Sequence, residues 1–169
     1  MAAATQISVD EYLHTTYRPD CDYVDGQVLE RNLGERDHSR PQMRLIMLFG
    51  AREKEWRVIV MPEQRVQVKP RRFRIPDVCV VHQDAPCEQI VTTPPLICIE
   101  ILSKDDSFSS IVDRLDDYVS MGVANIWVID PHKRRAYTYG ARGTIEAIDG
   151  ELHVADSNIS VPLASIFES

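Results

Sequence analysis

Apolar residues recur every three or four positions in three stretches of the chain, the spacing of helices that bury one face. Residues 7–13 predict a short helix whose first turn Ser8 can cap. Residues 38–54 predict a second helix. A third is predicted over residues 106–122, a stretch that opens with capping residues and closes with a glycine, which readily ends a helix.

Elsewhere the apolar residues alternate with polar ones or run together over short stretches, as they do in strands. Residues 21–31 predict a hairpin that turns at Asp25 and Gly26, because an Asp-Gly pair favours a two-residue turn. Further strands are predicted at residues 56–61, 63–70, 74–81, 96–102, 125–130, 135–140, 144–149 and 151–156, with a last helical turn at 161–168.

Residues 96–102, LICIEIL, are hydrophobic almost without interruption, which indicates a strand that is covered on both faces at the centre of a sheet. A helix and then the apolar strand at residues 125–130 follow it. This order is typical of two parallel strands joined by a right-handed crossover. The pattern therefore predicts an α/β fold with a central sheet flanked by helices.

The length of 169 residues fits a single domain over residues 1–169, since domains commonly run to about 100–200 residues. The first residues lack the basic and apolar regions of a signal peptide, and no apolar run is long enough to span a membrane. The four cysteines form no CxxC pair, and Cys79 and Cys98 lie in apolar strands, which favours reduced thiols and a cytoplasmic protein. Cys79, His82 and Cys87 have no evident fourth partner, so we expect no zinc site.

The net charge of −7 argues against a protein that coats nucleic acid through bulk electrostatics, because binding to phosphates depends on clustered lysines and arginines. Two local basic stretches remain, KPRRFR at residues 69–74 and HKRR at residues 132–135. Short basic runs of this kind are usually solvated turns.

Two carboxylates lie in or beside the segments most suited to the core. Asp77 opens a strand directly after Pro76, and Glu100 lies inside residues 96–102, on the same strand face as Cys98 and Leu102. A carboxylate in apolar surroundings needs a raised pKa, a salt bridge or a metal.

Each acid also has a purely structural interpretation. Pro76-Asp77 is a common turn, and Glu100 can pair with an arginine, for which Arg74 and Arg114 are the candidates. If the two strands are neighbours, however, the acids meet at one end of the sheet. Two carboxylates with room for water are what Mg²⁺ selects.

The motifs that surround the two acids resemble those of the Uma2-like family, also called DUF820, of endonucleases in the PD-(D/E)XK superfamily. The strongest matches are RIPDVCVV, PPLICIEILSKDDSF and DRLDDYVSMGVANIWVIDP, with weaker ones in VDEYL, in DYVDGQVLE and at His38. The resemblance implies a restriction-endonuclease-like αβββαβ core with a central mixed sheet and an N-terminal hairpin. It further implies that Asp77 and Glu100 bind the metal and that Asp22 approaches them from the hairpin.

The chain departs from the superfamily pattern at its lysine. The motif places a lysine two residues after the acid, where this chain has Leu102. The resemblance implies that in Uma2-like proteins the lysine comes from the next helix instead. At that position this chain has Arg114. Arginine stabilises phosphate charge but stays protonated, so it cannot act as a general base. Lys104 and His38 are further candidates for an accessory role.

The resemblance implies a Mg²⁺-dependent endonuclease that hydrolyses DNA phosphodiester bonds, with Mn²⁺ as a substitute. Asp77, Glu100, Asp22 and Arg114 would form its site, and a homodimer would suit an enzyme that cuts both strands. Two alternatives remain open: a catalytically impaired member of the fold that binds nucleic acid or protein, and a structural protein in which Arg114 pairs with Glu100. The residues expected to guide the DNA backbone are Lys69, Arg71, Arg72 and Arg74.

Overall fold

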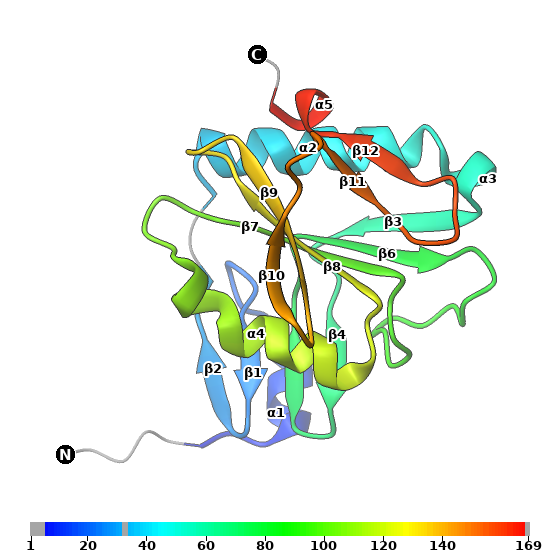
Figure 1. The fold of residues 1–169 in the computed structure, drawn as a ribbon. Helices are drawn as coiled ribbons and strands as arrows, with labels where there is room; N and C mark the ends of the chain where they lie inside the picture. Colours follow the sequence, from blue (N-terminus) through cyan, green and yellow to red (C-terminus); the bar gives the residue numbers. More distant parts are fainter. Residues whose placement is uncertain (1–5, 32–33, 168–169) are drawn as a thin grey trace.

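A computed structural model describes residues 6–31 and 34–167, and its centre is a six-stranded sheet (Figure 1). The strand order is β10-β9-β8-β7-β6-β3, and only the β7–β8 pair is parallel, so the sheet is mixed. The strands are β3 (Val58–Pro62), β6 (Val78–His82), β7 (Ile97–Ile101), β8 (Asn125–Asp130), β9 (Arg135–Gly140) and β10 (Gly143–Glu146).

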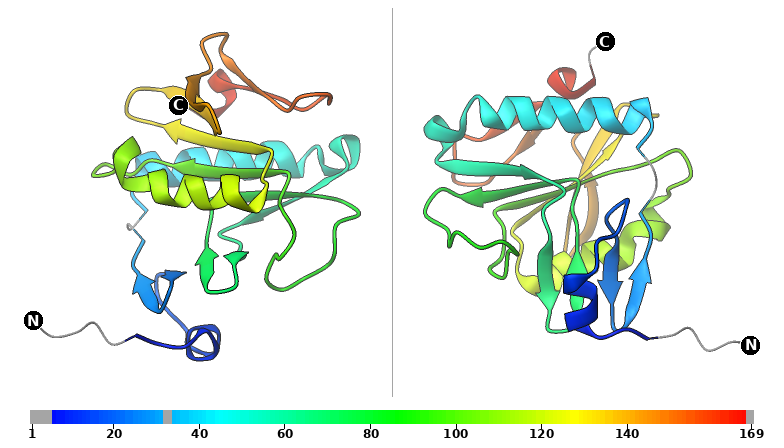
Figure 2. Two further views of the ribbon diagram at one scale, coloured as in Figure 1. Left: turned by 60° about the horizontal axis from the view of Figure 1, so that its bottom comes forward. Right: turned by 180° about the vertical axis from the view of Figure 1, so that it is seen from behind.

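One long helix covers each face of this sheet (Figures 1 and 2). Alternate residues of β7 point to opposite faces, as the sequence predicts. Ile97 and Ile99 pack with residues of α2 (Arg36–Gly50), whereas Cys98 packs with residues of α4 (Phe108–Met121). Glu100 therefore shares the face that α4 covers.

The ends of α4 are set by local sequence. The side chain of Ser107 accepts a hydrogen bond from the Ser110 amide, and the Ser110 side chain accepts one from the Ser107 amide. Gly122 ends the helix with a φ of 96°, a conformation that costs glycine little. These two caps fix which residues of α4 face the sheet.

A second, antiparallel sheet brings the N-terminal hairpin to the main sheet (Figure 1). Its strand order is β2-β1-β5-β4, so the hairpin of β1 and β2 pairs with β5. In the sequence, β4 and β5 lie between β3 and β6. The predicted turn is confirmed, with positive φ at Asp25 and Gly26, and Ser8 caps the first helix. These elements are α1 (Val9–His14), β1 (Asp22–Val24), β2 (Gln27–Leu29), β4 (Val66–Lys69) and β5 (Arg72–Arg74).

The C-terminal elements pack on the α2 side of the main sheet. Leu152, Val161 and Ile166 join the same apolar cluster as α2, and α5 contacts α2 directly. These elements are β11 (Glu151–His153), β12 (Ser160–Pro162) and α5 (Leu163–Phe167).

The order α2, β3, β6, β7, α4, β8 confirms the predicted αβββαβ core. Several predicted boundaries differ from the observed ones by a few residues, and two predictions were wrong. The helix predicted over residues 38–54 ends at Gly50, and a separate turn of helix, α3 (Glu53–Trp56), follows because Trp56 turns back to pack on Phe49. Residues 72–74 are a strand rather than a solvated turn, because Phe73 and Arg74 are buried. Across the described residues, no helix is both long and apolar enough to cross a membrane.

Candidate active site

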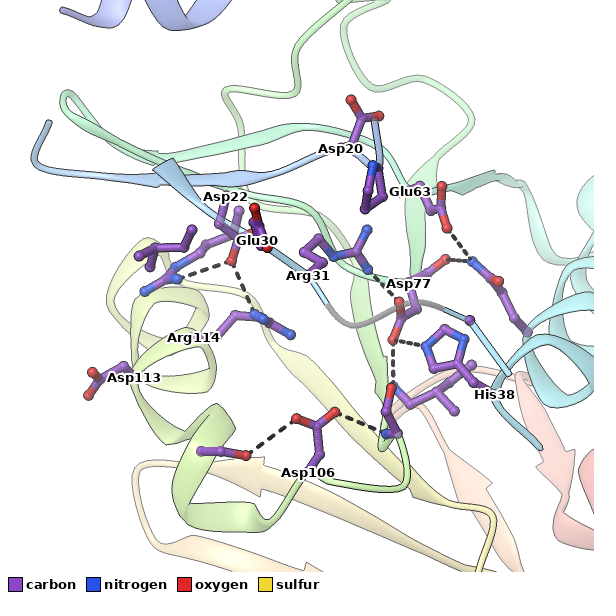
Figure 3. Close-up of a pocket in the computed structure, with 18 of the residues that line it drawn as sticks. Asp20, Asp22, Glu30, Arg31, His38, Glu63, Asp77, Asp106, Asp113 and Arg114 are labelled. Carbon is purple, nitrogen blue, oxygen red and sulfur yellow. Dashed lines mark hydrogen bonds and ion pairs between the residues drawn. The ribbon is translucent and has the colours of Figure 1, made fainter. Parts of the chain in front are cut away.

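A cavity of about 560 Å³ opens where the two sheets meet (Figure 3). Its wall takes Asp22 from β1, His38 from α2, Arg74 from β5 and Arg114 from α4, so elements far apart in the sequence share it. Asp77 lines it from the residue before β6. The wall is acidic: seven carboxylates and four guanidinium groups line it, so acidic side chains outnumber arginines by three.

The pairing of β6 and β7 brings the two predicted acids to the same end of the sheet. Val78 lies opposite Ile99 in this antiparallel pair, so the next pair in the same register is Asp77 and Glu100. Each carboxylate residue is only 2% exposed. β6 and β7 are therefore neighbours. From the sequence, Asp77 and Glu100 were expected to meet only if their strands were neighbours.

Three donors meet the Asp77 carboxylate. Arg31 donates to Oδ1, the Ile101 amide donates to Oδ2 at 2.7 Å, and Nε2 of His38 lies 3.2 Å from Oδ2. Burial alone would raise the pKa of Asp77, but the hydrogen bond from His38 and the charge of Arg31 outweigh it and lower the pKa. Asp77 is therefore held as an anion.

Glu100 is held by α4. Nη1 of Arg114 donates to Oε2 at 2.7 Å, and the Tyr118 hydroxyl donates to Oε1 at 2.6 Å. Burial raises the pKa of Glu100 despite the opposing effect of Arg114, whereas Glu100 raises the pKa of Arg114 far above its ordinary value. The salt bridge and the raised pKa are two of the three solutions expected for a carboxylate in the core.

Asp22 holds the arginine side chains in place. Its Oδ2 accepts from Nη1 of Arg74 at 3.0 Å and from Nε of Arg114 at 3.2 Å, and its Oδ1 accepts from the Ile75 amide at 3.1 Å. Through Arg114, the hairpin acid is thus linked to Glu100 on β7.

Most of the basic residues expected to guide DNA are engaged with one buried acid. Asp117, 2% exposed, accepts from Nε of Arg74 at 2.8 Å and from Nη1 of Arg72 at 3.0 Å, and Nζ of Lys69 lies 3.2 Å from it. Arg74 is itself only 4% exposed. The structure gives these three side chains a part in joining β4 and β5 to α4, while Arg71 is exposed.

Of the two candidates for an accessory role, one lines the cavity and the other does not. His38 lines the cavity, whereas Lys104 is exposed and does not line it. Leu102, at the position of the motif lysine, is buried against α4. The side chains that sequence reasoning missed are Arg31, Asp117 and Tyr118.

The signals for these missed residues differ. Asp117 and Tyr118 follow Arg114 by three and four positions, a spacing that puts side chains on the same helical face. Tyr118 was therefore recognisable as a neighbour of Arg114 on the helix predicted over residues 106–122. Nothing in the sequence near Arg31 points to Asp77, because the contact joins positions 46 residues apart.

The donor set suits Mg²⁺ rather than zinc. No group of three or more His, Cys, Asp or Glu side chains that could hold a metal occurs within residues 6–31 and 34–167. Structural zinc needs four such ligands, whereas Mg²⁺ usually binds one or two carboxylates and keeps several waters. Asp77 and Glu100 fit Mg²⁺ in type and number, and the acidic wall adds favourable charge. In this structure Arg114 donates to Oε2 of Glu100 and Tyr118 donates to Oε1.

The comparisons with known proteins agree with this geometry. A solved structure described as a "putative nuclease belonging to DUF820", from Anabaena variabilis ATCC 29413, matches with a TM-score of 0.82 and 20% sequence identity over 95% of this chain and 97% of that chain. At this identity the likeness shows the fold. No curated protein matches the chain. The model of the Uma2 family, described as "putative restriction endonuclease", matches residues 9–162, and the chain therefore belongs to the Uma2 family.

Proposed function

We propose that the protein is a metal-dependent endonuclease that hydrolyses phosphodiester bonds in DNA. The observation that carries the proposal is the position of Asp77, directly before β6, and of Glu100, on the neighbouring strand β7, at the same end of the sheet. Asp77, Arg31 and Arg114 line the cavity at this end. Membership of the Uma2 family supports a nuclease, and DNA is the substrate that a restriction endonuclease would take.

Arg31 and Arg114 would bind the phosphate. Both line the cavity, and each guanidinium has several N–H groups, so it can reach a phosphate oxygen while it keeps a bond to its carboxylate. As negative charge grows on the phosphate oxygens during attack by water, these fixed positive groups would stabilise it.

Mg²⁺, or Mn²⁺ in its place, would be held by Asp77 and Glu100, and when bound it would polarise the phosphate and lower the pKa of the attacking water. Tyr118 and the Ile101 amide hold the two acids in orientation, because each donates to one of their oxygens. Asp22 would act as a positioning residue for Arg114.

His38 would move a proton at the edge of the cavity. Burial alone would lower its pKa, but the hydrogen bond and charge of Asp77 more than compensate and raise it, so the imidazolium is favoured. Hydrolysis adds water to phosphorus and breaks one P–O ester bond, and the leaving oxygen takes up a proton. A protonated imidazole that lines the cavity is suited to supply it.

Cleavage of supercoiled plasmid and of single-stranded DNA with Mg²⁺, Mn²⁺ or EDTA tests the proposal. Asp77→Ala and Glu100→Ala should both abolish metal-dependent cutting while circular dichroism shows an unchanged fold. Lys54→Gln, an exposed change outside the cavity, should cut as the wild type does. An active wild type whose Asp77→Ala and Glu100→Ala variants cut equally well would mean that the activity lies elsewhere or is a contaminant.

The Arg114–Glu100 ion pair favours one second candidate, a catalytically impaired member of the fold that binds nucleic acid or protein. An arginine that already neutralises a metal ligand competes with the metal for that ligand. This function would show as no cutting under any condition, no rise in melting temperature on addition of Mg²⁺ or Mn²⁺, and retained binding of DNA or of a protein partner.

A further inference from the structure

A second hollow, of about 370 Å³, lies outside the candidate active site and is rich in arginine. Four arginines line it with a single acid, Asp37, over a largely apolar floor that includes Pro41 and Phe167. The four residues, named here the arginine surface, are Arg36, Arg40, Arg44 and Arg134. The chain has a net charge of −7, so the arginine surface is a locally positive region of an acidic protein.

Helical spacing creates most of this surface. Arg36, Arg40 and Arg44 are four residues apart on α2, so they form one row about 12 Å long. Arg134 joins them from the turn between β8 and β9, where its guanidinium lies 5.8 Å from the centre of the Phe167 ring. That turn belongs to the basic stretch at residues 132–135, which the candidate active site does not use.

Among residues 6–31 and 34–167, no acid neutralises the charges of the arginine surface. No carboxylate of the described residues lies within ion-pair distance of its four guanidinium groups, and Asp37 is instead near His132, at 3.8 Å. Arg36, Arg40 and Arg134 are exposed. By contrast, Lys69, Arg72 and Arg74 are all paired with Asp117.

The arginine surface and the candidate active site both take residues from the first turn of α2, on different sides of the helix. Arg36 lies two residues before His38, which lines the cavity and contacts Asp77, so the first turn of α2 supplies residues to both places. Acidic side chains outnumber arginines by three in the cavity wall, so the wall is a poor match for a nucleic-acid backbone in the absence of metal. A positive region outside the cavity would add backbone affinity to the phosphate contacts of Arg31 and Arg114.

We propose that the arginine surface binds the phosphate backbone of duplex DNA beyond the bond that is cut. This inference rests on the proposed nuclease function. The row on α2 spans the axial length of about three to four base pairs, since duplex DNA rises about 3.4 Å per pair. Because arginines that contact phosphates carry no base code, the surface sets position and affinity and not sequence preference.

The test is fluorescence anisotropy of a labelled duplex in EDTA, which prevents cutting, over a series of salt concentrations. Arg40→Gln/Arg44→Gln should weaken binding at least about tenfold and reduce the slope of log affinity against log salt by about 2, since each phosphate contact contributes about 0.9. Lys54→Gln/Arg142→Gln makes the same change of charge at exposed positions outside both hollows and should bind within about twofold of the wild type.

Equal affinity and slope in the two double variants would overturn the inference, as would a wild type that binds no duplex. Neither result depends on catalysis, which the plasmid assay measures separately. A wild type that binds through Arg40 and Arg44 but does not cut would support the arginine surface while the proposed nuclease activity fails. If the wild type cuts DNA while both double variants bind alike, the proposed nuclease function would stand and the proposed role of the arginine surface would fail.

Discussion

Arg114 and Glu100 form a partly buried ion pair in which Nη1 of the arginine lies 2.7 Å from Oε2 of the carboxylate. The same guanidinium reaches Asp22 through Nε at 3.2 Å, so one side chain joins the N-terminal hairpin, α4 and β7. Arg114 also stands at the helix position for which the resemblance to Uma2-like proteins implies a lysine. The pair is therefore a structural link, and it is the point at which the proposed activity is most open to change.

Arg114→Lys should raise Mg²⁺-dependent cleavage by at least about tenfold, because an amine can lose its proton and act as a base, an effect commonly worth about 10²–10⁴ in rate. A lysine also makes a single contact and leaves Glu100 freer to bind metal. Initial rates of plasmid nicking at equal protein concentration measure the change. Arg114→Met, which removes the charge, should give no gain, and a lysine variant no faster than the wild type would count against the role of this position.

Removal of Arg114 should destabilise the fold. Arg114→Met leaves Glu100 and Asp22 buried without this cation, and loss of one partner of a buried pair commonly costs about 3–5 kcal/mol. In the double variant Arg114→Met/Glu100→Gln, the loss of unfolding free energy should be about 1–3 kcal/mol smaller than the sum of the two single losses. This is the coupling expected of residues in contact. Urea unfolding of the four proteins measures this cycle, and strictly additive losses would mean that the pair contributes no coupling.

Asp117→Asn should lower the free energy of unfolding by about 3 kcal/mol at pH 7, because Arg74 loses a buried ionic partner. Burial would raise the pKa of Asp117, but hydrogen bonds from Arg74, Arg72 and Lys69 lower it below the ordinary 3.8. A lowered pKa means that the stabilisation is present above 3.8 and is lost as the pH falls through the folded value.

Urea unfolding between pH 7 and pH 3 therefore distinguishes this role from simple packing. The difference between wild type and Asp117→Asn should shrink below about pH 4. Asp116→Asn is a matched control on the same helix, since the one side-chain partner of Asp116 among the described residues is the hydroxyl of Tyr139, in an exposed bond. A gap between wild type and Asp117→Asn that stays constant with pH would show that ionisation of Asp117 contributes nothing.

Local patterns predicted the core and its two acids well. The continuous apolar run around Glu100 and the helical face of α4 are properties of neighbouring residues, so periodicity reveals them. The side on which Glu100 lies followed from strand parity alone, and Cys98 and Leu102 confirm it by packing against α4.

Contacts between distant segments were beyond this reasoning. The strand at residues 72–74 has a basic sequence, and only its partners show why it is buried: Asp117 on α4 and Asp22 on the hairpin neutralise Arg74. Arg31 likewise reaches Asp77 only because the hairpin pairs with β5. Charge read along the sequence thus misassigned residues 69–74 to a solvated turn, whereas three of their four basic side chains are paired with acids.

The His38–Asp77 contact should appear as a displaced titration. Asp77 raises the pKa of His38 against the opposing effect of burial, so Asp77→Asn should lower the imidazole pKa. Because the folded pKa is raised, the stabilisation from His38 is full below its ordinary 6.5 and is lost as the pH rises through the folded value. NMR of the imidazole signals, with His14 as an exposed reference, gives the pKa directly.

Unfolding experiments supply the second half of that prediction. The difference in unfolding free energy between wild type and His38→Gln should be larger at pH 6 than at pH 9, since only the protonated ring forms the ion pair with Asp77. In an Asp77→Asn background the same pair of proteins should lose most of this pH dependence, because the anion that favours the imidazolium is gone. A His38 signal that titrates alike with and without Asp77 would show that the two side chains are not coupled, and would remove His38 from the proposed proton transfer.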